Sequence, residues 1–264
     1  MTGCHFDGYA ANAAITVCVG EGKVADKVAD CVMAAHHAHK AAQRKIKEGA
    51  TNSEVTAAIA AVCESYKVNA VEGVLSHKIK KHLIDGNDVI INKETGEQRV
   101  EEFEFMAGDV IALDVYVSTG EGKPKESENR CTVFKRELHT VYNLKINASR
   151  KFFTECNKKF PTLPFALRQF EDVTSAKVGV KECMDHDLVM PFPVLTEKNG
   201  EIVAQFSSTV AVLPRSTAVL AGDIAVEEER FAPANPITSE EVKELVNCEL
   251  WKKEDKKKVQ KSNK

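Results

Sequence analysis

The clearest strand signal in this chain is the segment Val110-Ile111-Ala112-Leu113-Asp114-Val115-Tyr116-Val117. Side chains alternate along a β-strand, so one face of it carries only aliphatic residues, namely Ile111, Leu113, Val115 and Val117. The opposite face carries Asp114 between Ala112 and Tyr116. Because an unpaired buried charge is costly, Asp114 needs either a polar partner or water. Two interpretations stay open: a polar site on this face, or an edge strand whose Asp114 is solvated.

Two helices are predicted upstream of this strand. From Val24 onward, apolar residues recur at the spacing of one helix face, namely Val28, Cys31, Val32, Ala35, Ala38, Ala42 and Ile46. Gly49 suits the C-cap of this helix. Thr51 and Glu54 have the spacing of a capping box, which predicts a second helix through Ser65.

The rest of the chain mixes strands and helices. We expect strands at residues 12–19, 202–206 and 209–213. A last helix is expected from Thr238, with Glu241 at capping-box spacing, and it should run into the C-terminal tail. Another helix is expected to present one apolar face, made of Phe152, Phe153, Cys156 and Phe160. The chain is therefore predicted to be of the α+β class.

Length, composition and cysteine spacing limit the classes of protein to which this chain can belong. The chain has 264 residues, 43% of them hydrophobic, which is enough to bury a sizeable core. Its eight cysteines form no C-x-x-C pair and are expected to be reduced thiols. No apolar run approaches 18 residues and the sequence shows no charged-then-apolar leader, so we expect no membrane span and a cytosolic protein.

The C-terminus carries the clearest charge feature. Residues 251–264 hold seven lysines against Glu254 and Asp255, a net charge of +5, which leaves −8 for the rest of the chain. The lysines are Lys252, Lys253, Lys256, Lys257, Lys258, Lys261 and Lys264. Such a tail binds phosphate by counterion release without reading sequence, which predicts contact with an anionic partner such as structured RNA. A merely solvated terminus is the alternative.

Two further groups of residues, three histidines and two serines, are weak candidates for catalysis. His36, His37 and His39 lie in the first predicted helix, and no acidic or cysteine residue recurs there at ligand spacing, so we expect surface histidines. Ser207 and Ser208 have neither a G-x-S-x-G turn nor a nearby base, which argues against a serine nucleophile.

Four segments resemble, in order and spacing, the metal-binding segments of type 2 methionine aminopeptidases. They are residues 5–12, Ser76-His77, residues 110–120 and residues 204–209. Those enzymes supply two Asp, one His and two Glu to a two-metal centre. The positions that match here are occupied by Met1, Asn12, His77, Asp114 and Ser207.

These substitutions remove most of the charge that a pair of cations needs. Hard divalent ions favour anionic oxygen ligands, and carboxylates bridge them while a metal-bound water attacks the substrate. Asn12 offers a neutral carbonyl and Ser207 a neutral hydroxyl, while Asp114 is one methylene shorter than Glu. We therefore expect no metal, no cofactor and no catalytic residue, with Asn12, His77, Asp114 and Ser207 as vestigial positions.

Further motifs resemble a catalytically silent branch of that fold, the proliferation-associated, ErbB-receptor-binding family. They are Glu72–His77, Val117–Lys123, Pro164–Arg168, Gly200–Phe206 and the lysine-rich end. The resemblance implies a pita-bread fold over residues 1–237, with a helical insertion at 142–196, followed by a helix and basic tail at 238–264. It also implies RNA and ribosome association, roles in growth, ribosome biogenesis or translation, and a cytoplasmic protein with a nuclear and nucleolar pool. The alternative function is an active, metal-dependent methionine aminopeptidase.

The chain begins at the strand that carries the first two ligand positions of that family. The resemblance therefore implies that the N-terminal half of the pita-bread fold is absent, through a late gene start, a short form or a fragment. A half-fold exposes surface that is normally buried, so we expect self-association or protein partners that cover it.

Overall fold

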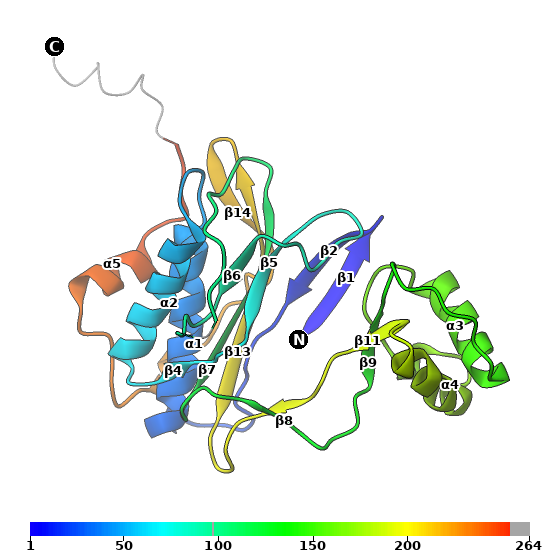
Figure 1. Cartoon of the computed structure of the whole chain (residues 1–264). Helices are drawn as coiled ribbons and strands as arrows, with labels where there is room; N and C mark the ends of the chain where they lie inside the picture. Colours follow the sequence, from blue (N-terminus) through cyan, green and yellow to red (C-terminus); the bar gives the residue numbers. More distant parts are fainter. Residues whose placement is uncertain (97, 254–264) are drawn as a thin grey trace. The chain divides into compact units, whose positions relative to one another are not determined.

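The computed structural model describes residues 1–96 and 98–253, which form two compact units (Figure 1). The first unit comprises Met1–Lys80, Ile84–Pro124 and the chain from Glu197 onward. The second comprises Lys81–Leu83 and Lys125–Thr196. No helix among the described residues is long and apolar enough to cross a membrane.

An antiparallel sheet organises the first unit. Its order is β14 (Ser216–Ala221), β13 (Val203–Leu213), β7 (Val110–Ser118), β5 (Leu75–Ile79) and β6 (Val89–Ile91), and β4 (Asn69–Ala70) also pairs with β7. The predicted strand at Val110–Val117 is therefore confirmed, as the central strand β7. Its four aliphatic residues are fully buried while the alternate residues are only half-buried.

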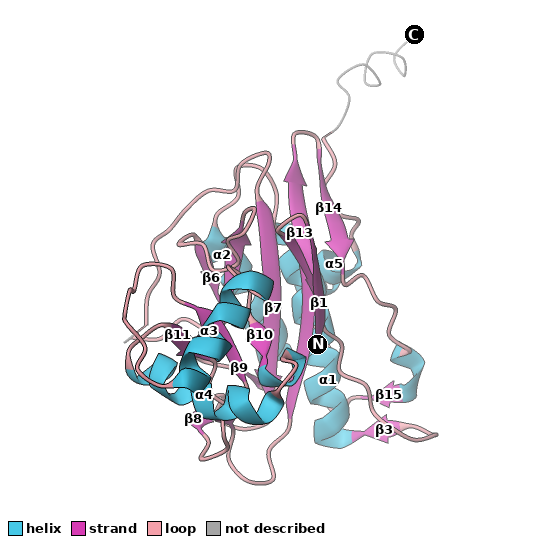
Figure 2. Ribbon diagram, turned by 90° about the vertical axis from the view of Figure 1, so that its right-hand side faces the viewer, coloured by secondary structure: helices cyan, strands magenta, loops and turns pink. Residues whose placement is uncertain are grey.

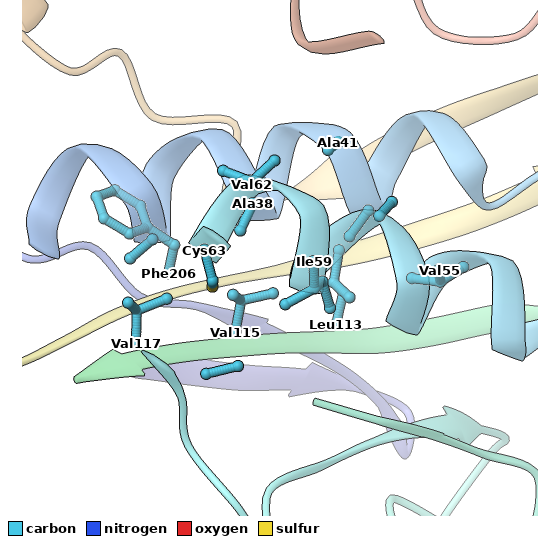
Figure 3. Packing of buried hydrophobic residues seen from close by; sticks show 14 of the residues in the cluster. Ala38, Ala41, Val55, Ile59, Val62, Cys63, Leu113, Val115, Val117 and Phe206 are labelled. Atoms are coloured by element: carbon cyan, nitrogen blue, oxygen red, sulfur yellow. The ribbon is translucent and has the colours of Figure 1, made fainter. Parts of the chain in front are cut away.

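Two helices cover the aliphatic face of the sheet. They are α1 (Asp26–Lys45) and α2 (Asn52–Ser65), and Figure 3 shows Ile59 of α2 beside Leu113 of β7, with Val62 on the side of α2 nearer to Ala38 of α1. Fully buried alanines on α1, including Ala38 and Ala41, leave room for α2 and the sheet to approach closely. Each large aliphatic side chain buried here contributes about 1.5–3 kcal/mol. The amphipathic pattern along α1 thus predicts the main core.

Shorter elements complete the first unit. The hairpin of β1 (Thr2–Phe6) and β2 (Tyr9–Ala13) packs through β2 against β13 and β14. β3 (Val24–Ala25) pairs in parallel with β15 (Phe231–Ala232) beside the start of α1, as Figure 2 shows. A 3-10 turn, η2 (Glu228–Arg230), precedes β15, and α5 (Glu240–Asn247) packs against α1 and α2.

The second unit has its own core. α3 (Asn147–Lys159) and α4 (Val173–Asp185) pack together, and a three-stranded sheet has the order β10 (Phe165–Ala166), β9 (Val133–Arg136), β11 (Val189–Pro191). β8 (Lys125–Glu126) pairs with β12 (Leu195–Thr196), and η1 (Leu167–Gln169) follows β10. Phe152 and Cys156 are buried as predicted, and Gly179 admits α3 because a Cβ there would lie 2.6 Å from Ala148 O. This unit begins at Lys125, before the 142–196 insertion, and contains strands besides helices.

Two strand predictions were wrong. The strand expected at 12–19 lies earlier, at Tyr9–Ala13, because it is the second arm of a hairpin whose turn, Asp7-Gly8, has positive φ angles of 49° and 84°. The two strands expected at 202–206 and 209–213 are one continuous strand, β13. Ser207 and Ser208 do not interrupt it because their hydroxyls have partners within the fold.

The second helix runs through Ser65 as predicted, whereas the ends of α1 and α5 differ from the predicted ones. α1 ends at Lys45, and Gly49 instead donates its N–H to Phe105 O. Thr51 is the N-cap residue of α2, but its side chain contacts Ser53 and makes no capping bond. The N-cap residue of α5 is Ser239, one residue after the expected Thr238, and its hydroxyl accepts from Val242 N; the helix ends at Asn247 without running into the tail.

Candidate functional site

The predicted site positions gather on the sheet face that α1 and α2 leave uncovered. Asp114 on β7 lies directly opposite Ser207 on β13 in the strand register, and His77 on β5 lies opposite Ala112. Directly opposed residues share a face, so His77, Asp114 and Ser207 are on the same side of the sheet. Asn12 reaches this face from β2.

Hydrogen bonds to both the nitrogen and the oxygen of its side-chain amide fix the orientation of Asn12. Its Nδ2 donates to Ser207 Oγ at 2.5 Å, and its Oδ1 accepts from Thr209 Oγ1 at 2.8 Å. The backbone N–H of Asn12 also donates to Thr209 Oγ1 at 2.9 Å. Ser207 and Thr209 are almost completely buried. This network ties the hairpin to the middle of β13.

Asp114 has protein partners rather than water alone. Gln205 Nε2 donates to Asp114 Oδ1 at 2.9 Å. Burial raises the pKa of Asp114 above its ordinary value, while hydrogen bonds from Gln205 and Ser207 and the charges of His77 and the N-terminal amine partly oppose that shift. β7 lies between β13 and β5, so the alternative of a solvated edge strand is wrong.

His77 is oriented by the backbone. Its Nδ1 lies 3.1 Å from Gly86 O, and because a carbonyl oxygen only accepts, Nδ1 must carry the proton. In the neutral ring the lone pair is then on Nε2.

These residues do not fit a two-metal centre. They offer one carboxylate, one imidazole, one amide and one hydroxyl. The amide and the hydroxyl are hydrogen-bonded to each other, so neither is free to bridge cations. A single negative charge cannot balance two divalent ions, and a pair of metals here would lack its bridging carboxylates.

The predicted lysines divide between described and undescribed residues. Lys252 and Lys253 are exposed, and their backbone pairs with β14: Lys252 bridges Ser216, and Lys253 N donates to Arg215 O at 2.8 Å. Thr217 N also donates to Trp251 O at 2.9 Å. Lys256, Lys257, Lys258, Lys261 and Lys264 lie outside the described residues.

The prediction of surface histidines on α1 was wrong. His36 and His39 are buried and His37 is half-buried. Burial lowers the pKa of all three rings, to about 4 for His37 and about 3 for His39. His36 Nε2 lies 3.2 Å from Glu228 Oε1, a residue 192 positions away. His39 follows Ala35 by four positions and precedes Ala42 by three, so its place in the apolar stripe could have indicated burial.

Ser208 has a base nearby, contrary to the sequence argument. His39 Nε2 lies 2.8 Å from Ser208 Oγ, and Gln43 Nε2 donates to the same oxygen at 3.0 Å. Ser208 is fully buried and His39 is 4% exposed, so this pair faces the α1 interface and not a substrate. The contact explains how a hydroxyl is accommodated in the core.

The sequence of this chain defines it as a member of the M24 class. The model of metallopeptidase family M24 matches residues 1–137. Proliferation-associated protein A of Dictyostelium discoideum is 41% identical over 223 residues, which is 83% of this chain and 58% of that protein. The curved DNA-binding protein of Schizosaccharomyces pombe is 36% identical over 267 residues, covering 100% of this chain and 70% of that protein.

The solved structure of a thermophilic Arx1 has the same fold. It superposes with a TM-score of 0.83 and 26% identity over 93% of this chain and 72% of that one. The chain belongs to the proliferation-associated, ErbB3-binding protein family and has its pita-bread fold. It spans little more than half the length of the first curated relatives that it matches.

Proposed function

We propose that this chain is a non-catalytic binding protein that associates with structured RNA and ribosomes, acting in growth, ribosome biogenesis or translation. Its place of action would be the cytoplasm, with a nuclear and nucleolar pool. The observation that carries the non-catalytic part is the pairing of Asn12 with Ser207, 2.5 Å apart through Nδ2 and Oγ. Two positions that hold carboxylates in the enzymes are here bonded to each other.

The state of Asp114 supports the same conclusion. Its carboxylate accepts from Gln205, so the remaining acidic group is also engaged with the protein. A two-metal peptidase activates water between two cations that bridging carboxylates hold. In this chain, the side chains at the corresponding positions form hydrogen bonds with the protein and do not provide carboxylates that bridge two metal ions.

The RNA-binding part is supported by charge and by the relatives. Lys252 and Lys253 are exposed beside Arg215, which is exposed as well, and five more lysines follow in the sequence. A relative is named a curved DNA-binding protein, which associates that protein with a polyanion. Lysine clusters bind phosphate backbones without sequence readout, so the surface suits folded RNA and ribosomes.

One pair of assays on the full chain tests both parts. The protein should co-sediment with purified ribosomes at low salt, and it should not release Met from a Met-initiated peptide in the presence of Co²⁺ or Mn²⁺. The peptidase assay should also be run on the Glu228→Gln variant, so that metal bound near Glu228, away from Asp114, does not affect the measured turnover. Metal-dependent turnover would establish the aminopeptidase alternative. Preferential binding of duplex DNA over ribosomes and RNA would replace the proposed partner.

A further inference from the structure

Two histidines of α1 and one glutamate of η2 converge on the helix-covered side of the sheet. His36 Nε2 lies 3.2 Å from Glu228 Oε1, and His37 Nε2 lies 3.7 Å from Glu228 Oε2. One donor atom from each of the three residues lies within 4.8 Å of the others, the one such group of histidine, cysteine and acidic residues in the described ranges 1–96 and 98–253. The cluster is separate from Asn12, Asp114 and Ser207, which occupy the other face.

The spacing of these donors matches tetrahedral metal coordination. Zinc–ligand bonds of about 2.0–2.1 Å at tetrahedral angles place neighbouring donors roughly 3.4 Å apart. The two measured separations, 3.2 Å and 3.7 Å, lie on either side of that distance. At 3.7 Å, His37 Nε2 is too far from Glu228 for a good hydrogen bond, so direct pairing alone does not account for its position.

The contact made by the second ring nitrogen of His37 is typical of histidines that bind metal ions. Its Nδ1 lies 2.7 Å from the hydroxyl of Tyr66, which is itself buried. When Nδ1–H donates to that oxygen, the Nε2 lone pair points toward Glu228. A hydrogen bond on the second ring nitrogen fixes both the tautomer and the orientation of a ligating imidazole.

Lys40 is a cationic neighbour in direct contact with Glu228, and it disfavours a bound metal ion. Its Nζ lies 3.4 Å from Glu228 Oε1, and its side chain is 27% exposed. A metal ion would therefore have to displace this ammonium from the carboxylate. His36, Lys40, Arg44 and Glu228 also line a cavity of about 370 Å³, which gives Lys40 room to move and leaves one side of the cluster open.

We propose that His36, His37 and Glu228 form a binding site for a divalent ion of the zinc class, which links α1 to the segment before β15. Two imidazoles and a carboxylate are a donor set that zinc and its first-row neighbours favour over calcium or magnesium. The three protein ligands leave a fourth position for water or an anionic ligand from the cavity. The site is independent of the proposed RNA function.

The test is a titration of chelator-treated full-length protein with Zn²⁺, against a chromophoric competitor. We expect one ion per chain, with Glu228→Gln weakening binding at least tenfold and Tyr66→Phe weakening it about tenfold. Lys40→Gln should strengthen binding several-fold, because it removes the competing ammonium. Tighter Zn²⁺ binding by Lys40→Gln would be specific evidence for the site, because a variant that merely damages the fold would bind Zn²⁺ more weakly.

Co²⁺ provides the matched spectroscopic check. Tetrahedral Co²⁺ bound by nitrogen and oxygen gives visible d–d bands without the charge-transfer band of cobalt–thiolate bonds, which excludes the exposed Cys4 and Cys248 as ligands. The exposed His139 serves as the control histidine, and His139→Gln should bind like the parent protein. Binding that is unchanged in Glu228→Gln, or no stoichiometric binding by the parent protein, would overturn the proposal.

Discussion

Asn12 and Ser207 are 195 residues apart in the chain, and their side chains meet at 2.5 Å. This bond joins the β1–β2 hairpin to the centre of the main sheet. Ser207 is completely buried and Asn12 is half-buried, so the bond is shielded from water on the Ser207 side. The pair therefore anchors the N-terminal hairpin to the main sheet.

Removing this hydroxyl should destabilise the protein measurably. In Ser207→Ala, the half-buried Asn12 Nδ2 loses its acceptor, and a typical protein hydrogen bond contributes about 0.5–1.5 kcal/mol. Urea unfolding of the parent and the variant would measure the loss. Ser53→Ala, at an exposed serine, is the control and should change stability by less than about 0.5 kcal/mol. Equal stability of parent and Ser207→Ala would show that the bond contributes nothing.

The raised pKa of Asp114 should appear in the pH dependence of stability. The folded carboxyl holds its proton to a higher pH than the unfolded one, so the folded state binds more protons between the two pKa values. Its contribution is therefore greatest below the unfolded value, about 3.9, and is lost as pH rises through the folded pKa. Relative to Asp114→Asn, the parent should lose stability as pH increases from about 3.9. Denaturant titrations at a series of pH values check the sign, and a parent that gains on the variant with rising pH would contradict it.

The tail should give RNA binding a steep salt dependence. If about five of the seven lysines contact phosphate, the log–log slope should be roughly −3.5 to −4.5, depending on whether the RNA is single- or double-stranded. Lys256, Lys257 and Lys258 are the densest cluster, so changing all three to Glu should flatten the slope and weaken binding similarly for different RNA sequences.

The matched deletion should begin at residue 254. Trp251 to Lys253 pair with β14, so a longer deletion would also disturb the sheet. Removing residues 254–264 should reproduce the effect of the triple substitution. Full affinity with little salt dependence after either change would place the RNA contact on the body of the fold.

The β1–β2 hairpin should promote self-association. Phe6 is 87% exposed and Tyr9 is 60% exposed, on adjacent arms of the turn. Neighbouring exposed aromatics favour contacts between molecules. Light scattering should show oligomers of the parent, and Phe6→Ser with Tyr9→Ser should reduce them. If the parent protein is monodisperse and unfolds in one sharp cooperative transition, the exposed hairpin does not promote self-association.

Local patterns were enough to predict the main layers. The alternation along β7 identified both the strand and its buried face, and the apolar stripe of α1 identified the helix that covers it. Ser207-Ser208 was misjudged as a break, because the partners that satisfy those hydroxyls, Asn12 and His39, come from distant segments. The contact of His36 with Glu228 depends in the same way on tertiary structure.

Gly222 restricts the substitutions that this chain can accept. It has a φ angle of +86°, and a Cβ atom there would lie 2.4 Å from Ser207 O and 2.7 Å from the Cα of Ser208. Both neighbours are backbone atoms of the central part of β13, so no side-chain rotation relieves the clash, and only glycine adopts this φ without strain. In a saturation-mutagenesis screen for folded protein, glycine alone should survive at position 222. The substitutions tolerated at this half-buried position after β14 are thus limited by the backbone of the neighbouring strand.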